Sequence, residues 1–193
     1  MPSASAGGVF LGEIMEYAKR IRRELAHKGN VIDLYTDTME TPDGDIVHYD
    51  FFHHNGAAAA VPVMDDGRIL MVRQYRNAVD RETLELPAGK LDYVGEPGLQ
   101  AAARELEEET GYRSDKLTFL ISVATTVALG NEVIDVFLAE DLKKAEQNLD
   151  FDEYIGVEAF TIEELNRMIF EGKIQDGKTI AGLMAYQVKK RGA

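Results

Sequence analysis

The sequence predicts an α+β fold in which helices pack on a mixed β-sheet. Two observations support this prediction. Several strand-like segments come first, one helical segment interrupts them, and two further strands precede two C-terminal helices. This order differs from the regular alternation of strand and helix that is typical of a parallel sheet. In addition, 193 residues with 45% hydrophobic and 28% charged residues suffice for one good-sized domain with a core.

A helix and a β-hairpin are predicted within the N-terminal part of the chain. Apolar residues recur at spacings of three and four between residues 10 and 26, which is typical of an amphipathic helix. These residues are Phe10, Ile14, Tyr17, Ile21 and Leu25. Residues 30–40 alternate between apolar and polar, and residues 46–52 return after the turn "TPDG". In that turn Pro42 sets φ and Gly44 tolerates a positive φ, so a hairpin is expected.

We expect residues 1–53 to form this helix and hairpin arm, and residues 54–193 to form one compact domain. Helices are predicted at residues 97–110, 160–172 and 179–190, and strands at residues 57–64, 68–75, 83–87, 117–126 and 133–140. Gly111 is well placed to end the first helix. Thr161 with Glu164 has the spacing of a capping box at the start of the second. The turn "DDG" between the first two strands indicates a second hairpin.

Composition and charge exclude several classes of protein. The formal net charge of −13 argues against a protein that grips nucleic acid through a broad basic surface. It permits a small phosphate-containing ligand whose charge is neutralised by metal ions. The chain has no cysteine, so it has neither disulfides nor a thiolate site. Neither a bilayer-spanning apolar run nor a secretory signal is recognisable, and a cytoplasmic location with no membrane partner is expected.

The segment "RELEEETGY" concentrates acidic residues on one predicted helix. Glu105, Glu108 and Glu109 are three and four residues apart and therefore share a face, whereas Glu107 points elsewhere. Like charges at this spacing repel by roughly 0.2–0.5 kcal/mol per pair. Mg²⁺ prefers oxygen ligands and is commonly held by a few carboxylates together with substrate phosphates. The segment therefore indicates either a metal site or a solvated acidic face.

The neighbouring residues favour the metal site. The loop "LPAG" precedes the helix, and one of its backbone carbonyls could reach a metal ion. Three successive alanines, residues 101–103, would let the helix approach the sheet closely. Arg104 could pair with a nearby carboxylate and orient it.

At this point the chain resembles the Nudix hydrolase family, whose signature is G-x5-E-x7-R-E-U-x-E-E-x-G-U, where U is a bulky residue. The residues that match are Gly89, Glu96, Arg104, Glu105, Leu106, Glu108, Glu109, Gly111 and Tyr112. The one departure is a spacing of six residues, instead of five, between Gly89 and Glu96. The resemblance implies a mixed sheet sandwiched between helices (α/β/α). It also implies metal-dependent hydrolysis of a nucleoside diphosphate linked to another group.

The resemblance also implies which residues bind the metal. Glu105 and Glu109 would be the main ligands of Mg²⁺, with Mn²⁺ as the alternative metal. Glu108 would be a further ligand or an orienting group, and the backbone carbonyl of Ala88 another ligand. The number of metal ions stays open.

Beyond the signature, the chain is similar to the ADP-ribose pyrophosphatase branch of the family. The similarity includes "QYR", "ELPAG" and the later segment "IQDGKT". It implies that Arg76 contacts the phosphates or terminal ribose of the substrate, and that Glu82 and Glu85 bind ribose hydroxyls. ADP-ribose would be cleaved to AMP and ribose 5-phosphate. The alternatives are an exposed arginine at a strand end and ordinary surface carboxylates.

A glutamate in the loop between the last two strands completes the predicted site. Glu132 matches the position at which the branch carries a general base or an additional metal ligand, although it could also be an ordinary loop carboxylate. The base could instead be a carboxylate of the acidic helix, Glu105, Glu108 or Glu109. The Ser-Pro-Gly that usually precedes it is replaced by "TVA", residues 126–128. Hydrolysis of another nucleoside diphosphate sugar therefore remains an alternative. A sensor that binds a nucleotide sugar without cleaving it is a second alternative, although every expected metal-site glutamate is present.

A homodimer is the expected assembly. Members of this branch typically exchange their N-terminal strands, and the hairpin around "TPDG" matches that arm. Tyr49, Phe51 and Phe52 would contribute to the interface or to base stacking, or else serve as ordinary hairpin residues. No role is assigned to His48, His53 or His54.

Overall fold

The structure is a computed structural model that describes residues 16–30 and 32–192. The chain separates into two compact units, of which the first ends at His53 and the second begins at His54. Among the helices in the described part of the chain, none is both long enough and apolar enough to cross a membrane.

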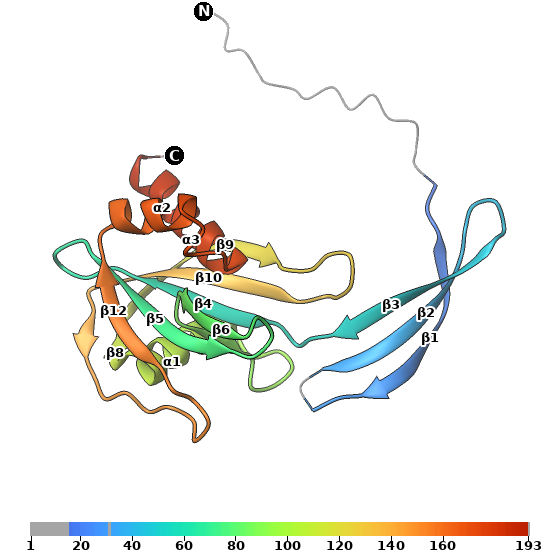
Figure 1. Ribbon diagram of the computed structural model, residues 1–193, viewed down its shortest axis with the longest axis horizontal. Helices are drawn as coiled ribbons and strands as arrows, with labels where there is room; N and C mark the ends of the chain where they lie inside the picture. The colour runs from blue at the N-terminus through green and yellow to red at the C-terminus, as the bar shows by residue number, and fades with distance from the viewer. Residues whose placement is uncertain (1–15, 31, 193) are drawn as a thin grey trace, which may run out of the picture. The chain divides into compact units, whose positions relative to one another are not determined.

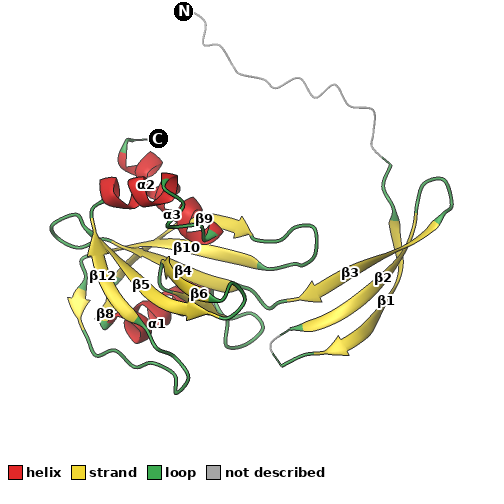
Figure 2. Cartoon of the chain, in the orientation of Figure 1, coloured by secondary structure: helices red, strands yellow, loops and turns green. Residues whose placement is uncertain are grey.

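The first unit is a three-stranded antiparallel sheet in the order β1-β2-β3 (Figure 2). The strands are β1 (Lys19–Lys28), β2 (Asp33–Glu40) and β3 (Ile46–His53). The predicted hairpin is confirmed, because β2 and β3 pair from Glu40 opposite Ile46 onward. Its turn contains Gly44 at a φ of 88°, a conformation that glycine adopts without strain.

The amphipathic helix predicted for residues 10–26 is wrong where the structure describes it, because residues 19–28 form β1. A spacing of four residues, as between Ile21 and Leu25, fits one face of a strand as well as one face of a helix. Pairing with β2 decides between the two. Arg23 of β1 reaches across to Asp37 of β2 with two hydrogen bonds of 2.6 and 2.5 Å. Residues 10–15 of the predicted helix lie outside the described residues.

The second unit contains two main sheets. One has the order β7-β4-β10-β9 and the other β12-β5-β6. Their strands are β4 (Ala57–Pro62), β5 (Ile69–Arg76), β6 (Arg81–Glu85), β7 (Ala88–Lys90), β9 (Lys116–Ala124), β10 (Val133–Glu140) and β12 (Gly156–Phe160). β4 runs parallel to β10 and the other pairs are antiparallel, so the predicted mixed sheet is confirmed. β8 (Tyr112–Arg113) and β11 (Lys143–Lys144) form a short separate pair.

The hairpin predicted for residues 57–64 and 68–75 is only partly correct. The turn forms, with the Gly67 N–H donating to Met64 O at 2.9 Å. Beyond a single bridge between Val63 and Ile69 the two strands diverge, and β4 and β5 join different sheets. β4 is apolar and buried on both of its faces, so it pairs with neighbours inside its own sheet instead.

Helices cover both faces of the sheet that contains β4, as Figure 1 shows for α1 (Gly98–Thr110), α2 (Ile162–Phe170) and α3 (Gly177–Lys190). Alternate residues of β4 face opposite layers. Ala58 and Ala60 pack in the clusters that include buried residues of α1. Ala59 and Val61 pack in the cluster that includes Leu183 of α3. The α/β/α arrangement implied by the sequence is thus confirmed.

The ends of two helices confirm local predictions. Gly111 follows α1 in a left-handed conformation, with φ at 68°, and its N–H donates to Glu107 O at 2.9 Å. Residues 145–148 then bond the last carbonyls of α1, with Gln147 Nε2 donating to Glu109 O at 2.6 Å. At the start of α2, Thr161 and Glu164 form the predicted capping box.

Candidate functional site

The acidic face of α1 is buried against the sheet. Glu105 and Glu109 are only 8% and 2% exposed, whereas Glu107 is exposed and Glu108 is intermediate. A solvated acidic face therefore describes Glu107 and not the other two carboxylates. Burying two carboxylates is costly unless a cation or hydrogen bonds compensate them.

The protonation behaviour of these carboxylates reflects that cost. Burial raises the pKa of Glu109 to about 8, with the charges of Glu105 and Glu153 acting in the same direction. A hydrogen bond from Ala88 N–H, at 2.9 Å, opposes the rise. Burial likewise raises the pKa of Glu105 to about 6, although Arg104 opposes it. Burial thus favours the protonated forms of both carboxyl groups in the metal-free protein, and a divalent cation would stabilise their charged forms.

Arg104 partly neutralises this charge and ties α1 to the preceding loop. Its Nη1 donates to Glu105 Oε1 at 2.7 Å and to Glu108 Oε2 at 3.1 Å. Its Nη2 donates to the carbonyl of Lys90 at 3.2 Å and lies 3.6 Å from Glu96 Oε2. The contacts fit the orienting role expected of Arg104.

The "LPAG" loop approaches α1 so closely that Gly89 has no room for a side chain. A Cβ at residue 89 would lie 1.9 Å from Glu105 Oε1. The loop is held from the other side by α3, where Thr179 Oγ1 accepts a hydrogen bond of 2.9 Å from Leu86 N–H. It is the N–H of Ala88 that contacts Glu109, and the carbonyl of Ala88 as a metal ligand stays a prediction.

The carboxylates fit a hard divalent cation by their chemistry and burial, but they are turned toward other partners. In residues 16–30 and 32–192, no three acidic or histidine side chains are already arranged around a common ion position. Glu105 and Glu108 bond Arg104, and Glu109 bonds the Ala88 N–H. Coordination would require Glu105, which is buried, and Glu108, which is half-buried, to turn from Arg104 toward the cation.

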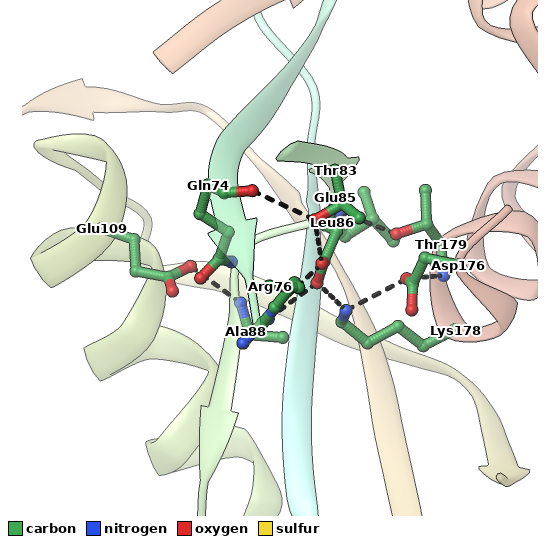
Figure 3. Close-up of polar contacts among 10 residues, drawn as sticks. All are labelled: Gln74, Arg76, Thr83, Glu85, Leu86, Ala88, Glu109, Asp176, Lys178 and Thr179. Atoms are coloured by element: carbon green, nitrogen blue, oxygen red, sulfur yellow. Dashed lines mark hydrogen bonds and ion pairs between the residues drawn. The ribbon is translucent and has the colours of Figure 1, made fainter. Parts of the chain in front are cut away.

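A second polar cluster lies beside the acidic centre (Figure 3). Arg76, at the end of β5, donates from Nε and Nη2 to the two oxygens of Glu85 at 2.9 and 2.8 Å. Thr83 and Lys178 also donate to this carboxylate. Burial alone would raise the pKa of Glu85, but Arg76 and Lys178 outweigh it and lower the pKa to about 2. Glu85 is therefore a buried anion at any moderate pH.

Arg76 is close enough to the acidic centre to be influenced by it. The pKa of Arg76 is raised, first by its hydrogen bond to Glu85 and also by the charge of Glu109. The Arg76 side chain is 42% exposed, whereas that of Glu85 is 4% exposed. The structure thus brings a partly accessible guanidinium and the buried carboxylates of α1 into one region.

Glu82 and Glu85 occupy different surroundings. All four acceptor sites of the Glu85 carboxylate are in use, so a ribose hydroxyl would have to displace one of its present donors. Glu82 is exposed, and its charge acts on Arg73. These interactions of Glu82 and Glu85 do not test ribose binding, which stays a prediction for both residues.

Glu132 contacts Thr125 and His54, which lie outside α1. Its carboxylate accepts from Thr125 Oγ1 and lies 3.4 Å from His54 Nδ1. His54, to which the sequence assigned no role, also accepts from the Gly56 N–H at 3.1 Å. None of the contacts described for Glu132 reaches a carboxylate of α1. Its role as base or metal ligand stays a prediction.

Glu153 is a candidate that sequence reasoning missed. It lies in the loop before β12, and its charge raises the pKa of both Glu105 and Glu109. The signal in the sequence is the acidic run "DFDEY", residues 150–154. Such a run is read as solvated surface unless its distance from α1 is known, and that distance is a property of the fold.

Comparison with known proteins agrees with this geometry. The family model described as the NUDIX domain matches residues 53–183. The chain belongs to the Nudix family. It is 38% identical over 174 residues to an ADP-ribose pyrophosphatase of Bacillus subtilis (strain 168), covering 89% of this chain and 94% of that protein. It is 35% identical over 182 residues to a methanol dehydrogenase activator of Bacillus methanolicus, covering 93% and 97%.

A solved structure shares the fold of this Nudix protein. It is titled "Crystal structure of ADP compounds hydrolase" and superposes with a TM-score of 0.82 at 19% identity, covering 94% of this chain and 99% of that one. At this identity the likeness concerns the fold alone. The prediction of a Nudix hydrolase is confirmed by the family match and the relatives. Dependence on a divalent metal ion is general among Nudix hydrolases.

We predict that the metal-free protein loses stability as the pH rises. The folded-state pKa values of Glu105 and Glu109 are about 6 and about 8, above the ordinary 4.5. Between pH 4.5 and pH 8 the folded state therefore binds more protons than the unfolded state. Their contribution is fully present below pH 4.5 and is lost as the pH passes 8, by an amount on the order of a few kcal/mol. Glu85 acts in the opposite direction, but only below pH 4.5.

Urea unfolding in EDTA at several pH values between 5 and 9 measures this loss. Glu109→Gln should flatten the dependence, whereas Glu107→Gln, on the exposed side of the same helix, should leave it as in the wild type. An unchanged slope in Glu109→Gln would contradict the prediction.

We also predict that Gly89→Ala weakens metal binding without unfolding the protein. The new Cβ would occupy the position of the Glu105 carboxylate, which can move because it ends a flexible side chain. Titration calorimetry with Mn²⁺ should show an affinity lower by roughly tenfold or more. Gly156→Ala is the matched control, because its new Cβ would meet Arg73 Cβ at 4.0 Å, an ordinary van der Waals contact. Unchanged Mn²⁺ affinity in Gly89→Ala would contradict this prediction.

Proposed function

We propose that this Nudix hydrolase cleaves ADP-ribose to AMP and ribose 5-phosphate, using Mg²⁺. The observation that carries the proposal is the placement of Arg76 beside the buried carboxylates of α1. The carboxylates of α1 suit a divalent cation, and Arg76 suits phosphate oxygens. The relative named ADP-ribose pyrophosphatase, which matches over most of both chains, supports this choice of substrate.

Arg76 retains the donors needed for the diphosphate. A guanidinium has five N–H groups, and Glu85 takes one from Nε and one from Nη2. The remaining edge, formed by Nη1 and the second hydrogen of Nη2, can bind two phosphate oxygens. Its orientation is fixed by Glu85, so binding a phosphate requires no new ordering of the side chain.

The carboxylates of α1 would bind the metal ion. Glu105 and Glu109, with Glu108 as a further ligand, would hold Mg²⁺ once Glu105 and Glu108 have turned from Arg104 toward the cation. The cation would neutralise phosphate charge and lower the pKa of a bound water.

A carboxylate is needed to accept the proton of the attacking water. In the hydrolysis, water oxygen bonds to one phosphorus, the bridging P–O bond breaks, and the bridging oxygen leaves with the other phosphate. Glu132 is the base that the family resemblance implies. Glu153 is supported by its electrostatic effect on Glu105 and Glu109. The two assignments predict different variants to be inactive.

The reaction is tested by measuring AMP release from ADP-ribose with Mg²⁺ and without it. Activity should be lost in Glu109→Gln and retained in Glu107→Gln. Glu132→Gln and Glu153→Gln are tested as separate single variants. The one that removes the base should lower kcat by roughly 10²–10⁴-fold.

The other outcomes of this assay separate the alternatives. Cleavage of a different nucleoside diphosphate sugar in a substrate panel would retain the metal site and overturn ADP-ribose as substrate. The replacement of Ser-Pro-Gly by residues 126–128 is the reason to include such a panel. Tight binding of ADP-ribose with no cleavage of any substrate would support a non-catalytic sensor.

We further propose that residues 1–53 are a dimerisation arm, and that the protein acts in the cytoplasm as a homodimer. In the first unit Arg23 lies over the ring of Phe51, and Tyr35 contacts the same ring. Leu25, opposite Tyr35, and Tyr49, opposite Asp37, belong to this face and are 51% and 56% exposed. A three-stranded sheet with such a face gains stability by covering it.

Sedimentation equilibrium of the full chain should give the mass of a dimer. Tyr49→Asp should shift the mass toward the monomer, because a carboxylate would be buried at the apolar interface. Thr38→Asp places the same charge on the opposite face of the sheet and should leave the dimer intact. A monomeric wild-type protein would overturn the assignment of the arm.

A further inference from the structure

The segment "IQDGKT" belongs neither to the proposed metal ligands nor to the proposed diphosphate contacts of Arg76. It forms the start of α3, where Asp176 is the N-cap and its side chain accepts from Thr179 N–H at 2.9 Å. Lys178, in the first turn, is only 7% exposed. Lysine is almost never buried to this degree unless its charge is paired. Its surroundings therefore show what the charge is used for.

Lys178 contacts two carboxylates. Its Nζ donates to Glu85 Oε2 and, at 3.0 Å, to Asp176 Oδ2. Figure 3 shows Arg76 and Lys178 on either side of the Glu85 carboxylate. The cluster contains two cations and two anions, so its charges balance. Lys178 is thus connected to Arg76 through one shared carboxylate.

Glu85 has no freedom left in this arrangement. Oε1 accepts from Arg76 Nε and from Thr83 Oγ1, at 2.9 and 2.6 Å. Oε2 accepts from Arg76 Nη2, at 2.8 Å, and from Lys178. Because a carboxylate has about four acceptor sites, each of the four donors limits its rotation. The plane of Glu85 in turn sets the plane of the Arg76 guanidinium, through two parallel hydrogen bonds.

Removal of Lys178 would alter Arg76 in two ways. Glu85 would lose the donor opposite Arg76 and could rotate, so the guanidinium would lose its fixed orientation. Among the described residues, Arg76 would also become the only cation that bonds Glu85. Its positive charge would then be more fully neutralised by Glu85 and less available to a phosphate.

We propose that Lys178 is a positioning residue for substrate binding, which holds Glu85 and thereby orients Arg76 toward the diphosphate. The proposal rests on the proposed function, in which Arg76 binds phosphate oxygens. The competing explanation is that Lys178 only stabilises the fold as part of a buried ion pair. The two explanations differ in whether the effect of Lys178 depends on Arg76.

A double-mutant cycle in the full-length, Mg²⁺-loaded enzyme tests this dependence. It uses Lys178→Met, Arg76→Ala and the double variant, with steady-state kinetics on ADP-ribose and a thermal melt for each. Lys178→Met should raise KM about tenfold or more and change kcat far less, because it weakens binding of the substrate diphosphate. In the Arg76→Ala background the same substitution should have almost no further effect on KM.

Two further variants complete the design. Lys189→Met, on the exposed C-terminal turn of the same helix, removes a lysine whose Nζ donates a hydrogen bond of 3.1 Å to Thr118 Oγ1 and should leave KM unchanged. Lys178→Gln keeps a donor toward Glu85 and should give an intermediate KM. It replaces Lys178→Met in the cycle if the latter does not fold. If neither variant folds, Lys178 is a requirement of the fold and the proposal is overturned.

The remaining outcomes distinguish this proposal from the proposed function. An unchanged KM in Lys178→Met, or an equal effect with and without Arg76, overturns the positioning role alone. An unchanged KM in Arg76→Ala overturns both the role of Arg76 and this proposal. If ADP-ribose is not cleaved but another nucleoside diphosphate sugar is, the substrate assignment fails, and the same cycle on that sugar still decides the role of Lys178.

Discussion

The close approach of α1 to the sheet is the constraint on which the rest of the site depends. Four alanines, Ala58, Ala60, Ala101 and Ala102, are fully buried between β4 and the helix. Small side chains let the backbones come near each other, and Gly89 does the same at the loop. The consequence is that Glu105 and Glu109 are inside the protein, where their charges are costly unless they are compensated. A wider separation would leave the same carboxylates solvated and without strong affinity for a cation.

The two halves of the candidate site deal with buried charge in opposite ways. Around Glu85 the charges are balanced within the protein, by Arg76 and Lys178, and the carboxyl has a strongly lowered pKa. Around Glu109 the compensation is incomplete, and the carboxyl has a raised pKa. A balanced cluster is suited to holding a fixed geometry. An unbalanced one is suited to capturing a charge from outside, and the two adjoin through Arg76.

Local chemistry made much of this fold predictable. The helix α1, its end at Gly111, the capping box of α2 and the hairpin around Gly44 all depend on residues within a few positions of one another. The strand β1 was missed because the spacing of Ile21 and Leu25 fits both a helix and a strand. Pairing with β2 decides the outcome, and a single segment contains no information about its partner.

The glutamates proposed as metal ligands could be selected from the sequence because they belong to one short motif, whereas the contacts of Glu85 could not be predicted. Glu85 and Lys178 are 93 positions apart in sequence. Without knowledge of that contact, Glu85 was interpreted as a ligand for ribose. Glu153 was missed for the same reason, since its effect on Glu105 and Glu109 depends on how a distant loop folds back.

The two faces of β4 have a consequence for how enzymes of this architecture can diversify. Its even-numbered residues support the helix that carries the carboxylates, and its odd-numbered residues belong to the core against which α3 packs. A change in side-chain size at one position therefore adjusts one wall of the site and leaves the other in place. Natural variation within the six residues of this strand can therefore adjust the position of α1 and its carboxylates separately from the core that packs against α3.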